Sequence, residues 1–450
     1  MKKIGLLFVG LVAELWLGGA LGWAAADAPV LIRGVDVYPV AGPVMKSVSV
    51  LVENGKIADI GAKVAAPKGA RIVEGKGLRV YPGLIDSATE LGLSEIESIR
   101  ESVDTGELGE FMPQLRALAS VNPGSEHFPV VRANGVTTAM TFPSGGGGEG
   151  GRGAGARQVI SGQAALIHTD GWTWEQMAVL PSAAIAVQFP GLGGRGGRGG
   201  NPDFAELFGE AGATGTYAQT LRTYQEEVSK LSDFFDEARR YQKAKAANEP
   251  GLVRELKYEA LIPVLEGKTP LAVSVSTPKT IHDAIQFADK QNVKVVLLQP
   301  RELGAAAAEL KAKNIPVILG KVLALPHGED DPYDQAFTLP LECYKAGVKF
   351  AFGTLENQFV RDLPYQAATA VAFGLPQEEA LKAVTINPAE IWGVSDQVGS
   401  IEKGKLADLV VTTGDILEIQ TQVKHVFIKG QDVDLTNKQT RLYEKYLARP

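Results

Sequence analysis

The sequence predicts an α/β protein in which a long region of alternating strands and helices lies between two strand-rich ends. Short runs rich in β-branched residues occupy residues 30–80 and return at 406–433, a pattern typical of strands separated by turns. Between them, residues 82–395 alternate helical periods with short apolar runs such as PLAVSVS, VKVVLLQ and IPVILG. Repeated βα units of this kind indicate parallel strands, arranged either as an open sheet or as a closed barrel.

The two ends of the chain predict one small β-module. An Asn54-Gly55 pair favours a two-residue hairpin turn near the N-terminal end, and a Lys-Gly turn occurs at 429–430. We therefore expect residues 27–81 plus 396–436 to build a composite module, 82–395 to form the main domain, and 437–450 to form a C-terminal helical tail. Within the main domain we expect helices at 280–292 and 377–384, and a charged helical insertion at 214–250.

Length and composition exclude several classes of protein. A chain of 450 residues suits one large α/β domain with an accessory module. Its 45% apolar and 22% charged residues exclude disorder or coiled coil for most of the chain. The net charge of −7 argues against a protein that holds nucleic acid by its phosphates. The single cysteine, Cys343, excludes an internal disulfide and a Cys-rich zinc site.

Residues 1–26 are typical of a signal peptide. Lys2 and Lys3 precede a long apolar stretch, and small residues at 24–26 supply a cleavage pattern before Asp27. We expect cleavage there, an exported protein that is periplasmic or secreted, and no stable membrane span afterwards. The alternative is an uncleaved anchor, but Glu14 in the middle of the stretch would be costly in a bilayer.

Two glycine-rich tracts interrupt the main domain, at 144–157 and 191–200. Neither has the strand, defined glycine turn and helix that a phosphate-binding loop requires. The second also resembles an arginine-glycine RNA-binding tract, which an acidic exported protein argues against. We expect both to be long loops at the rim of the barrel, with a lid or a partner contact as the functional alternative.

The segment YPGLIDSATELGLSE at 81–95 resembles the amidohydrolase superfamily, in which a PGLID-x-H-x-H stretch ends the first strand of a (β/α)8 barrel. Segments at 126–144, 363–394 and 399–411 resemble, in the same order, the GVTT strand, the closing helices and the return into the β-module. The likeness is closest to exported, imidazolonepropionase-like members. It implies a (β/α)8 TIM-like barrel with a small β-sandwich built from both chain ends.

The resemblance implies metal-assisted hydrolysis of C–N or amide bonds by one or two divalent ions, held by four His, an Asp and often a carboxylated Lys. The positions that match these ligands are Ala88 and Glu90 after the first strand, Ala184 on the fourth, Ser274 (or Ser276, with a two-residue shift) on the fifth, Gln299 on the sixth and Leu355 on the eighth. Alanine and leucine cannot coordinate a metal, and neutral Ser and Gln are poor ligands. We therefore expect degenerate ligand positions, no metal centre of this design and no cofactor.

The remaining histidines offer few replacements. We expect His282 to be a cap or surface residue, and His127 and His425 to have no role. His168 is a candidate at a strand end for the pocket, with a purely structural role as the alternative. His327 adjoins Glu329, Asp330 and Asp331, which form either a solvated acidic loop or a cation site. Cys343 fits a helix interior, and no base partner for a nucleophile is recognisable.

Two functions from different classes follow. The favoured one is a pseudoenzyme: a non-catalytic binding or assembly partner that pairs with an active amidohydrolase or holds a peptide-like or sugar-like ligand. The alternative is an active exported hydrolase with a remodelled, mononuclear zinc, manganese or iron site, or a metal-free one, that uses Glu90 and Glu356, with Asp86 as a third candidate. Asp86 is expected chiefly to brace its strand end. A structural secreted module without a ligand is a third option.

Overall fold

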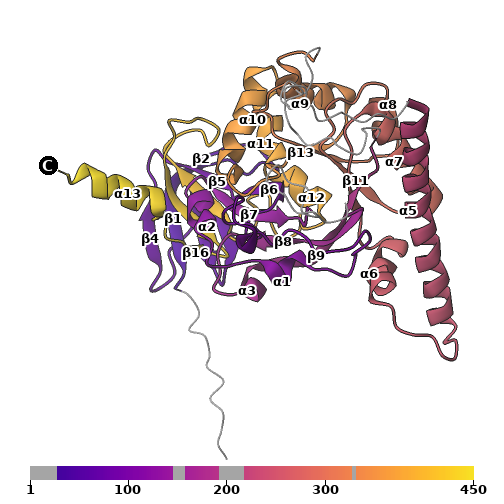
Figure 1. Ribbon diagram of the computed structural model, residues 1–450. Helices are drawn as coiled ribbons and strands as arrows, with labels where there is room; N and C mark the ends of the chain where they lie inside the picture. The colour runs from indigo at the N-terminus through magenta and orange to yellow at the C-terminus, as the bar shows by residue number, and fades with distance from the viewer. Residues whose placement is uncertain (1–27, 145–157, 192–216, 327–330, 450) are drawn as a thin grey trace, which may run out of the picture.

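The computed structural model describes residues 28–144, 158–191, 217–326 and 331–449. The signal-like segment, most of both glycine-rich tracts, and His327 with Glu329 and Asp330 lie outside the described residues. Two eight-stranded sheets organise the chain, a small one beside the chain ends and a larger barrel-like one (Figure 1). No helix in the described ranges is long and apolar enough to cross a membrane.

The small sheet combines strands from both ends of the chain. Its order is β16-β15-β14-β5-β1-β2-β3, and β4 also pairs with β1. The strands are β1 (Val30–Val37), β2 (Met45–Glu53), β3 (Lys56–Gly61), β4 (Arg71–Glu74), β5 (Arg79–Pro82), β14 (Leu409–Thr412), β15 (Val423–Ile428) and β16 (Gln431–Asp432). The two ends meet where β5 pairs antiparallel with β14, with Val80 opposite Val411. The strands form one hydrogen-bonded sheet, so the expected sandwich of two sheets is not confirmed.

Both predicted hairpin turns are present. Asn54 and Gly55 have φ values of 51° and 75°, and Lys429 and Gly430 have φ values of 49° and 78°. Two successive positive φ angles are typical of the type I′ turn, whose twist matches that of the flanking strands. The two turns also pack closely, because a Cβ added to Gly430 would lie 2.9 Å from the Gly55 Cα.

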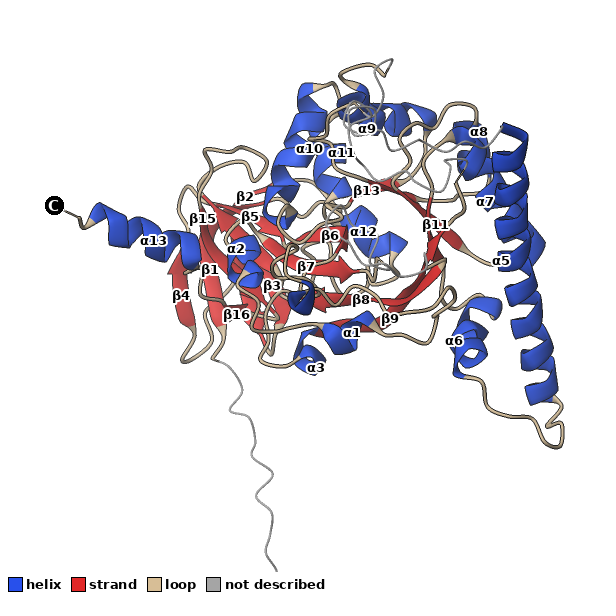
Figure 2. Cartoon of the chain, viewed as in Figure 1, coloured by secondary structure: helices blue, strands red, loops and turns tan. Residues whose placement is uncertain are grey.

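The larger sheet has the order β13-β12-β11-β10-β9-β8-β7-β6. Its strands are β6 (Leu84–Thr89), β7 (Val136–Thr141), β8 (Ile160–His168), β9 (Ala178–Gln188), β10 (Leu271–Ser274), β11 (Val295–Leu298), β12 (Val317–Leu319) and β13 (Phe350–Phe352). It curves until its edges nearly meet (Figure 2). The Leu355 N–H, just past β13, donates a 2.7 Å hydrogen bond to the Ala88 carbonyl on β6.

One strand departs from the all-parallel pattern that the sequence predicts. β8 runs antiparallel to both β7 and β9, whereas the other neighbouring pairs are parallel. Only the four-residue helix α3 (Trp174–Met177) lies between β8 and β9. A connection this short cannot return the chain for a parallel pairing, which needs a crossover of a dozen or more residues.

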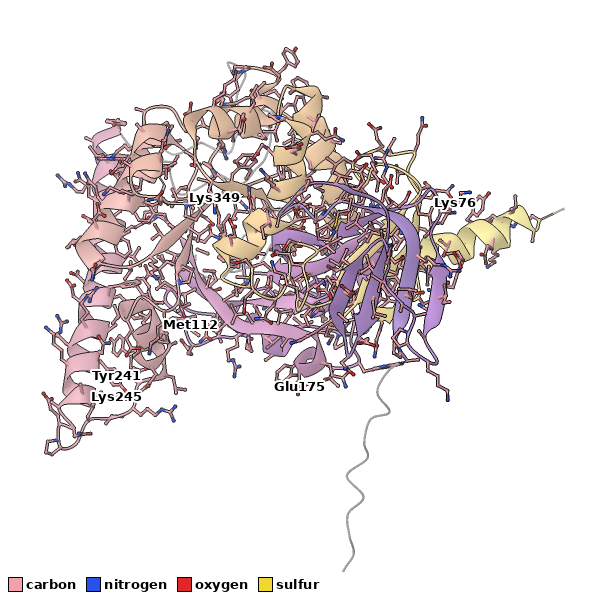
Figure 3. All side chains as sticks on the ribbon, turned by 180° about the vertical axis from the view of Figure 1, so that it is seen from behind. Lys76, Met112, Glu175, Tyr241, Lys245 and Lys349 are labelled. Atoms are coloured by element: carbon pink, nitrogen blue, oxygen red, sulfur yellow. The ribbon has the colours of Figure 1, made fainter. Side chains whose placement is uncertain are left out.

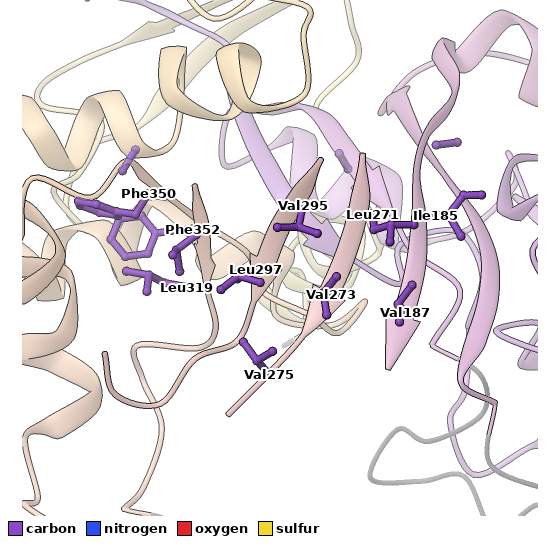
Figure 4. Close-up of a cluster of buried hydrophobic side chains, with 14 of the residues drawn as sticks. Ile185, Val187, Leu271, Val273, Val275, Val295, Leu297, Leu319, Phe350 and Phe352 are labelled. Atoms are coloured by element: carbon purple, nitrogen blue, oxygen red, sulfur yellow. The ribbon is translucent and has the colours of Figure 1, made fainter. Parts of the chain in front are cut away.

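Most of the helices lie around the larger sheet, whereas α13 (Lys438–Leu447) extends away beside the small sheet (Figure 1) and α12 (Ile386–Ile391) contributes Ala389 to the interior cluster. The other helices are α1 (Ala117–Ser120), α2 (His127–Arg132), α5 (Tyr217–Ala246), α6 (Leu256–Leu265), α7 (Pro278–Gln291), α8 (Ala306–Ala312), α9 (Gln335–Ala346), α10 (Leu363–Ala372) and α11 (Gln377–Ala383), with short 3₁₀ turns at Arg100–Ser102 and Val360–Asp362. The expected helices at 280–292 and 377–384 are confirmed as α7 and α11. Outward-facing strand residues such as Val273, Leu297 and Phe352 form the apolar layer beneath the helices (Figure 4).

The charged insertion forms the 30-residue helix α5, which extends past the barrel beside α6. Tyr241 and Lys245 mark its outer part, at the opposite end of the molecule from Lys76 of the small sheet (Figure 3). Both side chains bind Glu259 of α6, at 2.6 Å from the tyrosine hydroxyl and 2.5 Å from the lysine ammonium group. These contacts hold the two helices together outside the core.

Candidate functional site

The interior of the barrel-like sheet is apolar. Alternate strand residues face inward because side chains on a strand alternate between its two faces. The resulting cluster contains Ala88 and Ala184, which are buried, and Leu355 packs against it half-buried. Three of the positions that match metal ligands in the family therefore contribute methyl groups and an isobutyl group to this core.

An aromatic pair fills part of the same interior. Trp392, which follows α12, is 3% exposed and packs with Phe142, at the end of β7, with ring centroids 5.8 Å apart. Ala389, Val394 and Val398 belong to the same cluster. The indole Nε1 has no hydrogen-bond partner among the described residues, so Trp392 acts there as a large apolar side chain.

Ser274 and Gln299 lie at the ends of neighbouring strands. Ser274 is the last residue of β10 and is half-buried, whereas Gln299 follows β11 and is exposed. Gln299 and Leu355 flank Gly320, since a Cβ on that glycine would lie 3.8 Å from the Gln299 Cγ and 3.2 Å from the Leu355 Cδ1. Ser276 lies further along, where its N–H donates to the Thr280 hydroxyl at the start of α7.

Two of these strand-end residues have left-handed backbone conformations. Gln299 has φ 59° and Leu355 has φ 67°. Such conformations are uncommon for side chains other than Gly, Asn and Asp. The backbone at position 355 therefore suits an aspartate better than the leucine that is present.

Asp86 is a buried carboxylate on β6. Its Oδ1 accepts hydrogen bonds of 3.1 Å from the N–H groups of Ala88 and Thr354, and its Oδ2 accepts one of 2.5 Å from the Thr354 hydroxyl. Burial raises its pKa to about 7, although these hydrogen bonds oppose the rise. The contacts connect β6 to the residues that follow β13.

Glu90 and Glu356 lie in a charged cluster at the strand ends together with Lys321, which follows β12. Glu356 forms an ion pair with Lys321, and the ammonium group also lies 4.7 Å from the centre of the Phe359 ring. Burial raises the pKa of Glu90 to about 7; the charges of Glu97 and Glu356 add to the rise, and that of Lys321 opposes it. The site therefore brings Glu90 and Glu356 together, with a lysine that sequence reasoning missed.

These residues do not fit a hydrolytic metal centre. Within the ranges that the structure describes, no group of three or more His, Cys, Asp or Glu side chains could hold a metal ion. Asp86 accepts three hydrogen bonds, Glu356 is paired with Lys321, and the inward positions Ala88, Ala184 and Leu355 are apolar. A divalent ion requires several converging nitrogen or oxygen donors, which this arrangement does not supply.

The described histidines lie outside the charged cluster. His168 is 2% exposed and pairs with Asp408 at 2.9 Å. It lies opposite Thr138 near the start of β7, so it faces the small sheet and not the strand ends where Glu90 and Glu356 lie. Its place follows from the antiparallel direction of β8, which puts the end of that strand at the other end of the barrel.

The other three described histidines have local partners. His282 is on the surface, as predicted, and its Nδ1 lies 2.8 Å from a carboxylate oxygen of Glu309. His127 Nε2 lies 3.2 Å from the Glu95 carbonyl, and His425 pairs with Asp432 at 3.0 Å in the small sheet.

Cys343 lies in the interior of α9, fully buried, and burial raises the pKa of its thiol to about 12. A thiol with so high a pKa is a poor nucleophile at neutral pH.

A cavity of about 500 Å³ lies away from the charged cluster, where the small sheet meets α11 and α12, and its lining includes Val40, Lys382 and Glu402.

Thr354 and Trp392 were also not among the predicted site residues. A signal for Lys321 was present, since it follows the apolar run IPVILG and so stands at a strand end. Trp392 carried no such signal, because nothing in its local sequence shows that it enters the barrel.

Comparisons with known proteins agree with this architecture. A family model described as the amidohydrolase family matches residues 326–433. The chain is 24% identical over 423 residues to the amidohydrolase tasK of Hapsidospora irregularis, covering 85% of this chain and 39% of that protein. It is 32% identical over 124 residues to a dihydroorotase of Geobacter sulfurreducens, covering 26% and 29% of the two chains. The chain thus spans about two fifths or less of the length of these relatives.

Solved structures give matches over almost the whole chain. An amidohydrolase from Thermotoga maritima aligns with a TM-score of 0.74 and 27% identity, covering 90% of this chain and 99% of its own. A prolidase crystallised with N-methylphosphonate-L-proline aligns with a TM-score of 0.53 and 18% identity, covering 90% of this chain and 100% of its own, a likeness of fold alone.

Proposed function

We propose that this chain, which belongs to the amidohydrolase superfamily, has lost the hydrolytic metal centre of the family and acts as an exported, non-catalytic binding or assembly partner. The observation that carries the proposal is the apolar packing of Ala88, Ala184 and Leu355 inside the barrel. These side chains have no atom that can coordinate a cation, and their neighbours fill the space around them.

The charged cluster supports the same conclusion. Glu356 is the nearest carboxylate to the position of the missing aspartate in sequence, but its side chain is engaged by Lys321. To bind a cation it would have to leave this ammonium group, and the lysine would then repel the ion. Glu90 remains as a single carboxylate whose burial favours the neutral form.

We envisage two uses for such a barrel. It could assemble with an intact amidohydrolase, or its mouth could hold a small peptide-like or sugar-like ligand against the charged cluster. Export to the periplasm or beyond is proposed from the N-terminal sequence alone.

One observation favours the alternative, an active hydrolase with a remodelled centre. A carboxyl group with a pKa of about 7 beside a lysine and a second carboxylate is the kind of group that serves in acid–base catalysis. In that case Glu90 would exchange a proton with the substrate, and replacing it by glutamine would abolish turnover.

The test combines metal analysis with activity. The full chain is purified with zinc, manganese or iron supplied, its metal content is measured by elemental analysis, and it is offered a panel of dipeptides and N-acyl compounds. An intact amidohydrolase carried through the same steps is the positive control. We expect far less than one equivalent of metal and no turnover. Near-stoichiometric metal with turnover would overturn the proposal, and metal-free turnover that Glu90→Gln abolishes would establish the alternative.

A further inference from the structure

The C-terminal helix α13 exposes an apolar face. It points away from the rest of the molecule, with the chain end at its tip (Figure 1). Leu442, Tyr443, Tyr446 and Leu447 are spaced by three and four residues, so they share one side of the helix; they are 38%, 67%, 52% and 69% exposed. No residue of α13 is buried by the part of the chain that the structure describes. A helix of this length is marginal alone in water and ordinarily depends on packing of its apolar face.

The same helix is strongly basic in an acidic protein. Residues 438–449 contain Lys438, Arg441, Lys445 and Arg449 against one carboxylate, Glu444, for a net charge of +3, whereas the whole chain has −7. The helix start is held in place by a capping box at Asn437. Arg441 also contacts Glu126, just before α2, at 3.1 Å. The orientation of the basic, apolar helix is therefore defined where it leaves the fold.

A surface of opposite charge lies in residues 96–108, which we call the acidic segment. It carries four exposed carboxylates and one arginine, for a net charge of −3. It also exposes three aliphatic side chains, Ile96 at 53%, Ile99 at 46% and Leu108 at 77%. The acidic segment thus combines apolar groups with carboxylates, as α13 combines apolar groups with cations.

The two surfaces are neighbours. Glu126, which Arg441 of α13 contacts, adjoins His127, and the His127 Nε2 lies 3.2 Å from the carbonyl of Glu95 at the edge of the acidic segment. One side of the molecule therefore presents a basic apolar helix and an acidic apolar segment on either side of the start of α2.

We propose that this side of the molecule is a self-association surface, on which α13 of one copy packs against the acidic segment of a second copy and receives the reciprocal contact. In a two-fold interface each patch meets the complementary patch of the partner, so adjacent patches of opposite charge make such a surface self-complementary. Tyrosine and arginine, which α13 supplies, are enriched in protein interfaces. This inference is independent of whether the barrel retains catalysis.

The test is a charge exchange in the full chain. One variant carries Lys438→Glu and Lys445→Glu, which changes the net charge of residues 438–449 from +3 to −1. The second carries Glu101→Lys and Glu107→Lys, which changes the acidic segment from −3 to +1. A matched control, Lys230→Glu with Lys243→Glu, reverses two exposed lysines on α5. Mass is measured by sedimentation from submicromolar to the highest soluble concentration, and circular dichroism checks folding.

We expect the unmodified chain and the control to dimerise, and each variant alone to dimerise about tenfold or more weakly. An equimolar mixture of the two variants is expected to recover the dimer. The acidic helix of the first variant then meets the basic segment of the second, and the unchanged basic helix of the second meets the unchanged acidic segment of the first. A monomeric unmodified chain overturns the proposal. Three other results would also overturn it. They are a dimer that neither pair of charge reversals weakens, a monomer whose α13 binds anionic vesicles, and a chain that pairs only with an intact amidohydrolase.

Discussion

The Thr354 hydroxyl donates a 2.5 Å hydrogen bond to the Asp86 Oδ2, although 268 residues separate the two positions. This contact, with the 3.1 Å bond from the Thr354 N–H to Oδ1, joins β6 to the residues after β13. It lies where the two edges of the barrel-like sheet meet, so the protonation state of one buried carboxyl group bears on the closure of the sheet.

The contribution of Asp86 to the free energy of unfolding is expected to decrease as pH rises from 3.8 towards 7. The pKa of Asp86 is raised from 3.8 to about 7 by burial, so between these values the folded state binds a proton that the unfolded state has released. Its contribution is complete below 3.8, declines as pH rises, and is lost above about 7. Urea denaturation across this range should show the stability difference between the unmodified chain and Asp86→Asn shrinking with pH. Thr354→Val removes a hydrogen bond that lowers the pKa of Asp86. This substitution should therefore extend the pH range over which the contribution of Asp86 is present to higher pH. A pH-independent difference would contradict this.

Glu90 should titrate near pH 7 in the folded protein. Because Lys321 lowers and Glu97 raises its pKa, Lys321→Met should move the titration to higher pH and Glu97→Gln to lower pH. Infrared or carboxyl ¹³C spectra, assigned by comparison with Glu90→Gln, measure the midpoint. Lys403→Met, which removes a lysine paired with Asp59 in the small sheet, is the control and should leave the midpoint unchanged. A midpoint near the ordinary 4.5 would show that the group is hydrated.

Trp392 should contribute strongly to stability through the barrel interior. Trp392→Ala leaves a cavity beside Phe142 and should cost about 3–5 kcal/mol. Trp392→Phe keeps most of the volume and removes an N–H without a partner in the described structure, so its cost should be much smaller. Chemical denaturation of both variants measures the difference. Equal losses would mean that the indole does not fill the interior.

The pair between His168 and Asp408 should couple the barrel to the small sheet. Both side chains are buried, and Asp408 also accepts a 2.7 Å hydrogen bond from the Lys429 N–H. Removing either partner leaves a buried polar group unsatisfied, so His168→Ala and Asp408→Ala should each cost about 3 kcal/mol or more. The double variant should cost clearly less than the sum of the two, as measured in a double-mutant cycle. Additive losses would rule out a direct interaction.

Several features were predictable because they depend on short stretches of chain. Asn54-Gly55 forms its hairpin turn, Cys343 lies inside a helix, and the charged insertion is the helix α5. The direction of β8 was not predictable, since the apolar pattern of a strand is the same in both directions. The burial of His168 against Asp408 depends on that direction and on a contact across 240 residues.

The residue types alone set the chemistry that each position can offer. Ala88 and Leu355 have no donor atoms in any fold, and a local turn follows from the two residues that make it. The tertiary structure alone decided which groups act on one another: that Lys321 engages Glu356, that Glu90 holds its proton to about pH 7, and that a basic helix lies beside an acidic segment. Coulomb interactions and desolvation depend on distances through space and on exclusion of water, and these exist only once the chain has folded.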